Sequence, residues 1–368
     1  MTEPGPTEVR LDRLRPAGIE AAISRAPIAW IPLGALEYHA DHLPNGTDGI
    51  TGQGLLERAA RRVGGVVLPW SYLTMGTLAL PWSFRYDPGL VAEALRQTLR
   101  QLPGHGVRVG VVHSGHAPLD LDHLVKRVCA EVEGEGIGLR AMGLTYLELN
   151  AALGTGLGTA WPVAVDHAAT METSWVAALA PELVATGLLP DDPAATVLGV
   201  YGPNPRFTAD AARGDAQIEA AVGLLADRAL GMVRGEPHDP FADLRVFVER
   251  YWPEPLALAG RAGDAGIAAV LLTNPGPVSR YLTSVGVRLD AVDVPAAGIE
   301  LRNPTAGETG LPIAAADLGP ERGFYVRRLQ TAELRLPVTV EPGDHDVALR
   351  VGLAGVTVRT FDQSVTFA

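Results

Sequence analysis

The stretch Ile31-Pro-Leu-Gly-Ala-Leu-Glu-Tyr-His-Ala-Asp-His-Leu-Pro-Asn-Gly-Thr-Asp48 joins an apolar run to a cluster of ionisable side chains. The cluster consists of Glu37, His39, His42 and Asp48. Charged groups at the end of a buried strand cost free energy unless something neutralises them. A metal ion binds carboxylate oxygens and imidazole nitrogens together, so this stretch predicts a metal site. A hydrogen-bonded polar turn is the alternative interpretation of the same residues.

Up to about residue 236, the chain alternates between strand-like and helix-like segments. Short apolar segments predict strands at 29–34, 65–70, 107–112 and within 137–149. Longer segments with helical spacing predict helices at 47–62, 87–102, 119–133, 173–183 and 209–233. This alternation requires crossover connections and a mostly parallel sheet with helices on both faces. We therefore expect residues 1–236 to form an α/β domain, a three-layer αβα sandwich.

The remainder of the chain has a different pattern. Residues 237–254 read as a linker that includes a short helix at 245–251. Apolar or alternating segments then predict strands at 267–273, 283–289, 332–340, 345–353 and 356–361. Short strands separated by Gly, Pro, Asn and Asp are typical of a β-sandwich, so residues 255–368 are expected to form an all-β domain. Glu341-Pro-Gly-Asp-His-Asp346 is expected to be a hairpin turn.

Composition argues against several classes of partner. The chain has 368 residues, of which 47% are hydrophobic, and a formal net charge of −12. This negative charge argues against binding to nucleic acid or to an anionic membrane. No apolar run reaches the roughly 18 residues of a transmembrane helix, and the first residues do not resemble a secretion signal. We expect a cytoplasmic protein.

The helix predicted at 119–133 carries two features for which we expect structural roles. The acidic residues of Leu119-Asp-Leu-Asp-His123 fit the solvated first turn of a helix. Cys129 is the only cysteine of the chain, so no intrachain disulfide can form. Its helical surroundings predict a small core residue.

Two further polar segments are candidates for a functional site. His113-Ser-Gly-His116 follows a predicted strand, and a sharp turn there would present His116. Glu172 falls at the start of a predicted helix, where a negative charge is favoured. Because ligands gather at the carboxyl ends of strands in parallel sheets, we expect residues 37–48 and 113–116 to share one site.

The motifs of residues 8–236 resemble those of the creatininase (creatinine amidohydrolase) family. Its first segment, P-x-G-x-x-E-x-H-x-x-H-L-P-x-x-x-D, is matched by Pro32, Gly34, Glu37, His39, His42, Leu43, Pro44 and Asp48. Later matches are Gly76-Thr77, His167-Ala-Ala-Thr-Met-Glu172-Thr-Ser174 and, in part, Ser114-Gly-His-Ala-Pro-Leu119. The resemblance does not extend to the C-terminal region.

The resemblance implies two divalent metal ions per chain, which are zinc, manganese or iron in this family. Glu37 and His116 would hold one ion and His39 the other, with Asp48 between them. Glu172 is the candidate for the last ligand. Some family members instead carry an acid two residues after the second-motif histidine, a position that Pro118 occupies in this chain.

Other residues are expected to assist. His167 would be the catalytic proton shuttle. His42, His113, Ser114 and Trp161 are candidates for the substrate pocket. His42 could instead orient a metal ligand, and His113 could be a core histidine.

The resemblance also implies an activity and an assembly. The expected protein is a homo-oligomeric, dinuclear amidohydrolase that uses metal-activated water to hydrolyse a C–N amide bond. The substrate would be a small cyclic amide, a formamide or a short peptide. The family's Gly-Gly-Asn is replaced by Ala117-Pro118-Leu119, which predicts a substrate unlike creatinine.

Two other hypotheses remain. One is a non-catalytic scaffold or ligand-binding protein whose β-sandwich recruits a partner, suggested by the altered second motif. The other is carbohydrate binding by the C-terminal domain, which rests on analogy of fold alone.

Overall fold

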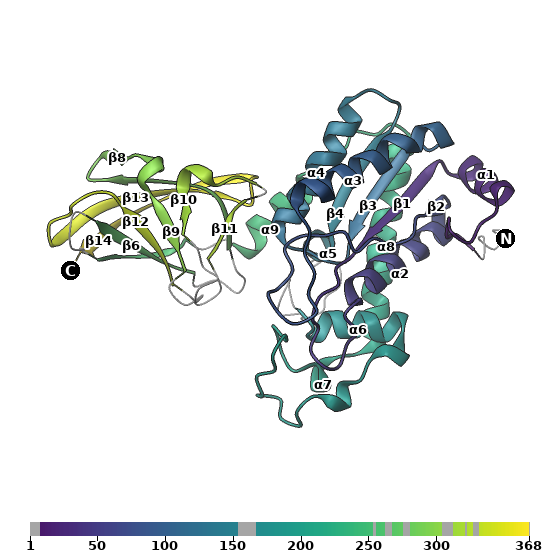
Figure 1. The fold of residues 1–368 in the computed structure, drawn as a ribbon, viewed down its shortest axis with the longest axis horizontal. Helices are drawn as coiled ribbons and strands as arrows, with labels where there is room; N and C mark the ends of the chain where they lie inside the picture. The colour runs from purple at the N-terminus through teal and green to yellow at the C-terminus, as the bar shows by residue number, and fades with distance from the viewer. Residues whose placement is uncertain are drawn as a thin grey trace. The chain divides into compact units, whose positions relative to one another are not determined.

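The computed structural model divides the chain into two compact units, Met1–Asp243 and Leu244–Ala368 (Figure 1). The described residues are 8–153, 167–252, 255–261, 267–274, 280–303, 312–320, 322–326 and 331–367. The segment expected to be a linker, 237–254, contains helix α9 (Ala242–Tyr251). Each unit is described by itself below.

The strands described in the N-terminal unit form one parallel sheet with the order β2-β1-β3-β4. Their bounds are Ile28–Leu33 for β1, Val66–Val67 for β2, Val109–Ser114 for β3 and Arg140–Thr145 for β4. Every residue of β1 and β3 is buried. Burial on both faces is expected for parallel strands that helices cover on either side.

Helices connect and cover these strands. The α-helices described in this unit are α1 (Pro16–Arg25), α2 (Thr47–Val63), α3 (Pro88–Gln101), α4 (Leu119–Gly134), α5 (Tyr146–Leu153), α6 (Thr170–Leu179), α7 (Pro205–Thr208) and α8 (Ala211–Val233). Short 3₁₀ helices are η1 (Leu102–His105), η2 (Pro181–Leu183) and η3 (Thr186–Leu188). No helix among the described residues is long and apolar enough to cross a membrane.

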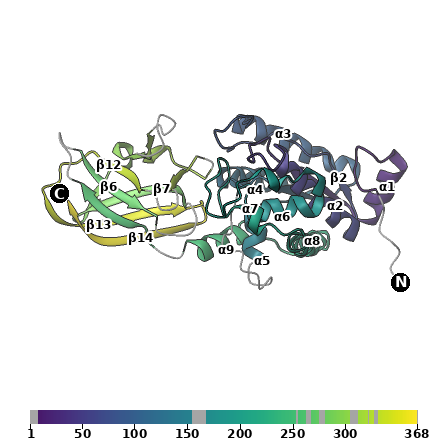
Figure 2. The ribbon, with the colours of Figure 1, turned by 90° about the horizontal axis from the view of Figure 1, so that it is seen from below.

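The two faces of the sheet pack against different helices (Figure 2). On one face, Leu95 of α3 and Leu124 of α4 share a core with Ile31 and Val112 of the sheet. Helices α2 and α8 contact each other and the sheet, and the indole N–H of Trp30, on the alternate face of β1, donates to the end of α2. The three-layer αβα sandwich is thus confirmed.

Local signals account for several helix boundaries. The side chain of Asp87 caps α3 by accepting hydrogen bonds from the backbone N–H groups of Gly89 and Leu90, with Pro88 at the first helical position. Asp210 caps α8 in the same way. The strand predicted within 137–149 is β4, which ends at Thr145 because α5 begins at Tyr146.

The first turn of α4 contradicts the expectation of a solvated surface. Asp122 is only 1% exposed. Lys126, one turn later, lies 3.8 Å from Asp122 Oδ1 and is itself buried. The helical pattern gave no sign of this burial, because the covering partner Glu148 comes from α5.

Beyond α9, the C-terminal unit consists mostly of strands, and its described strands pair antiparallel throughout. One sheet has the order β10-β9-β12-β6-β5, and the other has the order β11-β7-β13-β14 with β8 paired to β7. The strand bounds are β5 (Ala257–Arg261), β6 (Ala268–Thr273), β7 (Arg280–Leu289), β8 (Val292–Val294), β9 (Glu300–Arg302), β10 (Ile313–Ala314), β11 (Phe324–Val326), β12 (Thr331–Leu336), β13 (Gly343–Leu353) and β14 (Thr357–Phe367). The predicted sandwich-like class is confirmed.

One predicted turn in this unit is wrong. Residues 337–342 connect β12 in one sheet to β13 in the other, so Glu341–Asp346 does not close a hairpin. The hairpin joins β13 to β14 instead, through Ala354 and Gly355, whose φ angles are +48° and +68°. Two consecutive left-handed residues are the backbone of a tight hairpin turn.

Candidate metal centre

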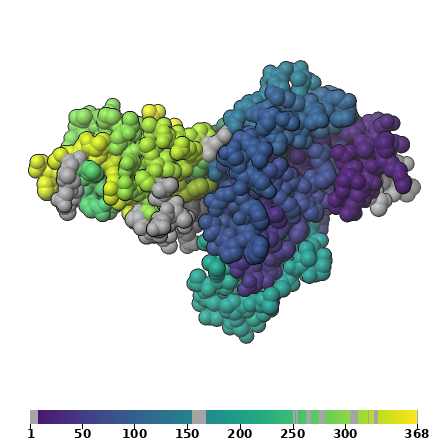
Figure 3. Space-filling view, viewed as in Figure 1, coloured from purple at the N-terminus to yellow at the C-terminus, as the bar shows by residue number. Residues whose placement is uncertain are grey.

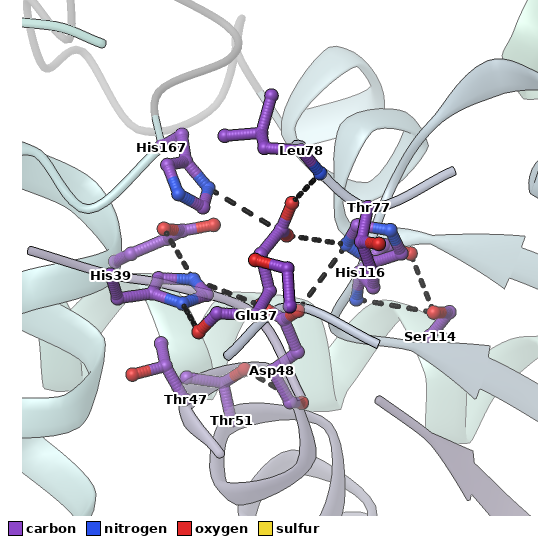
Figure 4. Close-up of polar contacts among 12 residues, drawn as sticks. Glu37, His39, Thr47, Asp48, Thr51, Thr77, Leu78, Ser114, His116 and His167 are labelled. Atoms are coloured by element: carbon purple, nitrogen blue, oxygen red, sulfur yellow. Dashed lines mark hydrogen bonds and ion pairs between the residues drawn. The ribbon is translucent and has the colours of Figure 1, made fainter. Parts of the chain in front are cut away.

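The ionisable residues singled out from the sequence converge at the carboxyl edge of the N-terminal sheet (Figure 4). Glu37 and His39 follow β1, and Asp48 lies in the first turn of α2. His116 lies between β3 and α4, and Glu172 lies in the first turn of α6. All five side chains are buried.

These side chains form two groups of three that share Asp48. In the first group, His116 Nδ1 lies 3.2 Å from Glu37 Oε2 and 3.3 Å from Asp48 Oδ2. In the second, His39 Nε2 lies 3.2 Å from Asp48 Oδ1 and 3.4 Å from Glu172 Oε2. Each oxygen of Asp48 therefore faces a different histidine.

Backbone carbonyls fix the tautomers of both histidines. His39 Nδ1 donates to the carbonyl oxygen of Glu37 at 2.9 Å, and His116 Nε2 donates to that of Met75 at 3.1 Å. Because a carbonyl oxygen only accepts, the opposite ring nitrogen carries the lone pair when the ring is neutral. Those nitrogens are the ones that face the carboxylates. Metal-bound histidines commonly donate their other ring N–H to a backbone carbonyl oxygen in this way.

Glycines allow α2 to approach the sheet closely enough to deliver Asp48. A Cβ at Gly115 would lie 2.1 Å from the backbone oxygen of Asp48. A Cβ at Gly34 would lie 2.4 Å from the backbone nitrogen of Gly49. Any side chain at Gly34 or Gly115 would push α2 away from the strand ends.

The carboxylates are also held by backbone groups. The N–H of Leu78 donates to Glu37 Oε1. The N–H of Ala168 donates to Glu172 Oε2 at 2.6 Å. Glu172 also lies in the first turn of α6, where the helix dipole favours an anion.

The buried carboxylates create a demand for positive charge. Although burial lowers it, the carboxylates of Glu37 and Asp48 raise the pKa of His116 to about 10. Burial also opposes protonation of His39, yet Asp48 and Glu172 hold its pKa well above the usual range. Within the described part of the chain, His39 Nε2 and Asp48 Oδ2 have no hydrogen-bond partner. Protons or metal ions can meet this demand, and the mixed nitrogen and oxygen donors fit zinc, manganese or iron.

His167 lies at the edge of this cluster. Its ring centroid is 4.3 Å from that of His39, and its Nδ1 is 3.9 Å from Glu37 Oε2. Its Nε2 donates to the carbonyl oxygen of Tyr38 at 2.8 Å. A backbone bridge to Tyr201 fixes the position of His167 in the chain. Glu37, His39 and His167 form a third possible ligand group.

The residues predicted for the substrate pocket lie in different places. His42 is buried, and its Nε2 forms a 3.0 Å hydrogen bond with Thr173 Oγ1. His113 is buried on β3, and burial lowers its pKa to about 4. Neither side chain belongs to the three possible ligand groups. Trp161 lies outside the described residues.

Ser114 supports the turn that carries His116. Its hydroxyl donates to the carbonyl oxygen of His116 at 2.5 Å and accepts from the N–H of the same residue at 3.1 Å. The supporting groups from Tyr38, Met75 and Leu78 could not be predicted from the sequence. These are backbone atoms, and no residue type signals their role.

The chain matches the creatininase family, described as creatinine amidohydrolase, over residues 12–228. Creatinine amidohydrolase of Pseudomonas putida is 25% identical over 203 residues, which are 50% of this chain and 75% of that protein. A crystal structure of creatinine amidohydrolase (creatininase) has a TM-score of 0.52 at 23% identity and covers 62% of this chain and 98% of its own. A variant creatininase of the Zn-Zn type has a TM-score of 0.50 at 22% identity, with coverages of 61% and 97%. The family match spans more than half of the sequence, and this chain therefore belongs to the creatininase family of amidohydrolases, which act on carbon–nitrogen bonds.

Proposed function

We propose that the N-terminal unit is a dinuclear metal-dependent amidohydrolase that hydrolyses the C–N bond of a small cyclic amide, a formamide or a short peptide. The observation that carries this proposal is the pair of ligand groups sharing Asp48. A single carboxylate facing two histidines through different oxygens is suited to bridging two ions.

The two groups give the proposed ligands. Glu37, Asp48 and His116 would hold one ion, and His39, Asp48 and Glu172 the other. One similar structure is a creatininase of the Zn-Zn type, and the donor set also suits manganese or iron. When bound, such a pair of ions supplies a nucleophilic water at neutral pH and Lewis acidity towards an amide carbonyl.

Glu172 is proposed as the ligand from α6 because the second-motif loop offers no acid at the equivalent position. Pro118 begins the approach to α4 and has no donor atom in its side chain. The carboxylate of Glu172 lies near His39, with Oε2 3.4 Å from His39 Nε2.

His167 is proposed to carry the proton to the leaving nitrogen. Its Nε2–H is committed to the carbonyl oxygen of Tyr38, so its Nδ1 is the atom that can accept and return a proton. This nitrogen faces Glu37 and lies beside the ligand groups. General acid–base catalysis of this kind contributes roughly 10²–10⁴-fold to the rate.

Metal analysis combined with an amide hydrolysis screen tests the proposal. Wild-type protein loaded with zinc, manganese or iron should bind about two ions per chain and turn over at least one amide. Glu37→Gln should lose one ion and the turnover, while the surface variant Glu131→Gln should retain both. Circular dichroism would show that the variants are folded.

Two results would contradict the proposal. A wild-type chain that binds no metal after loading would exclude the metal centre. Tight binding of two ions without turnover across a broad panel of amides would favour a non-catalytic ligand-binding protein.

A further inference from the structure

Solvent reaches the proposed centre beside His167. The His167 side chain is 15% exposed, whereas the five proposed ligands have side chains exposed by 8% or less. Of the six side chains in the three possible ligand groups, His167 is therefore the one most exposed to solvent, and an approaching substrate would meet it first. Tyr38 lies between Glu37 and His39 in the sequence, and its carbonyl oxygen accepts the hydrogen bond that holds the imidazole of His167.

Residues 82–84 are attached to one side of the segment around Tyr38. The hydroxyl of Ser83 accepts from the N–H of Tyr38 at 3.1 Å. The N–H of Phe84 donates to the carbonyl oxygen of Leu36 at 2.9 Å. Asn45 Nδ2 donates to the carbonyl oxygen of Trp82 at 2.7 Å. These bonds fix the segment directly to the chain that supplies the metal ligands.

Residues 198–201 contact the side chain of Tyr38 and the ring of His167. A Cβ on Gly199 would lie 2.7 Å from the ring of Tyr38, so this backbone packs directly on the ring. The ring centroid of Tyr201 is 5.8 Å from that of His167. In Figure 3 the teal residues of this part of the chain lie against the purple and blue residues of the N-terminal unit.

Both attached segments expose large apolar side chains. Trp82 is 74% exposed and Leu198 is 63% exposed, while Phe84 and Tyr201 are about half exposed. We call these four residues the Tyr38 rim. Exposed apolar side chains gathered beside a functional site are typical of a binding surface.

The backbone of Trp82 adds a second, independent observation. Its φ angle of +60° lies in the left-handed region, which is strained for a bulky residue. The hydrogen bond from Asn45 holds it there. Strain of this kind persists where the surrounding structure enforces it, and it concentrates at ligand-binding sites.

We propose that the Tyr38 rim binds an apolar substituent of the substrate, next to the amide bond that is hydrolysed. This inference rests on the proposed function and specifies its substrate class: amides that carry an aromatic or branched aliphatic group. Tyr201 of the rim lies beside His167, with ring centroids 5.8 Å apart, and both rim segments contact residues 36–38, so a substituent of the reacting amide would lie close to the rim. A second copy of this chain is the competing occupant.

Binding of two matched probes tests this inference without relying on turnover. The probes are acetohydroxamate and phenylacetohydroxamate, which share the chelating group and differ by the phenyl ring. Isothermal titration calorimetry on the zinc-loaded full chain should show the phenyl probe binding at least about tenfold more tightly. Trp82→Asn should reduce this ratio to about threefold or less, since asparagine tolerates the left-handed backbone while removing the indole.

The control is Val292→Asn, which replaces a similarly exposed apolar side chain of the C-terminal unit and should leave the ratio unchanged. If the two probes bind the wild-type protein with nearly equal affinity, the proposed role of the rim is wrong, whereas the proposed metal centre is not affected. Failure of both probes to bind would overturn the proposed function as well. A Trp82→Asn variant that changes the oligomeric state, measured by sedimentation, with an unchanged probe ratio would assign the rim to an interface between copies and overturn the substrate site.

Discussion

Two clusters of buried ionisable side chains lie near the carboxyl edge of the N-terminal sheet, and they balance charge differently. In one, Lys126 Nζ lies 2.8 Å from Glu148 Oε1 and donates to the carbonyl oxygen of Gly143 at 2.7 Å. Burial raises the pKa of Glu148 and of its neighbour Asp122. Both acids therefore take up protons more readily than exposed carboxyl groups do, and Lys126 is the permanent cation of the cluster.

Among the described residues, no lysine or arginine forms an ion pair with Glu37 or Asp48 of the proposed metal centre. The positive groups that face them are His39 and His116, whose ring nitrogens can exchange a proton for a metal ion. A buried cluster that contains its own lysine is complete, whereas one balanced only by histidines can accept an external cation. The exchangeable charge, and not burial alone, therefore distinguishes the proposed metal site from the lysine cluster.

Removing the shared carboxylate should have the largest effect. Asp48→Asn deletes one ligand from both groups, so we expect metal content to fall to one ion or fewer per chain. Turnover should fall at least about 10⁴-fold, equivalent to about 5.4 kcal/mol of barrier. Elemental analysis and steady-state kinetics measure both quantities. The matched control, Asp122→Asn in the lysine cluster, should keep its metal; equal metal loss in the two variants would erase the distinction between the clusters.

Removing the lysine should damage stability instead of activity. Lys126→Met leaves Asp122 and Glu148 buried without their cation, which costs about 3–5 kcal/mol of unfolding free energy. The loss should be larger at pH 8 than at pH 5, because the two acids can take up protons at the lower pH. Urea denaturation measures it. Arg127→Met, in an exposed pair on the same helix, should cost less than about 1 kcal/mol. Equal losses of unfolding free energy in the two variants would show that the buried pairs of Lys126 stabilise the protein no more than the exposed pair of Arg127.

The sequence contained enough local information to place the first cluster but not the second. Glu37, His39 and Asp48 lie close together in sequence, and the apolar strand before them indicates that their side chains are buried. Asp122 and Lys126 look like ordinary residues of a helix surface, because their burial depends on Glu148 of α5. Periodicity describes one helix and carries no information about which later element covers it.

The C-terminal unit shows the same limit for turns. A Pro-Gly-Asp cluster at 342–344 predicts a hairpin, yet Gly343 and Asp344 begin β13, and the chain reaches them from the other sheet. The hairpin uses Ala354 and Gly355, where only one glycine signals it. Turn residues identify where the chain bends, but the pairing of strands depends on contacts distant in sequence.

Proton exchange at the metal centre should follow pH. The raised pKa of His116, about 10 against 6.5 for an ordinary histidine, gives the metal-free protein stability below about pH 6.5 that is lost as the pH rises towards 10. Its melting temperature should therefore fall across this window, and metal affinity should rise roughly tenfold per pH unit for each proton displaced. Calorimetry in buffers with different ionisation enthalpies should detect about two protons released per chain. Metal binding without proton release would contradict this exchange.

A neutral contact beside the centre should matter least. Thr173→Val keeps the side-chain shape but removes the hydroxyl that bonds His42 Nε2, at an expected cost of about 1 kcal/mol in unfolding free energy. Because burial lowers the pKa of His42 to about 4, this ring is neutral and its loss of a partner leaves no buried charge. Thr98→Val, whose hydroxyl bonds within α3, is the matched control and should cost about 0.5 kcal/mol or less. Metal content should be unchanged in both variants. If Thr173→Val instead releases metal, His42 contributes to metal binding and is not merely a neutral neighbour of the centre.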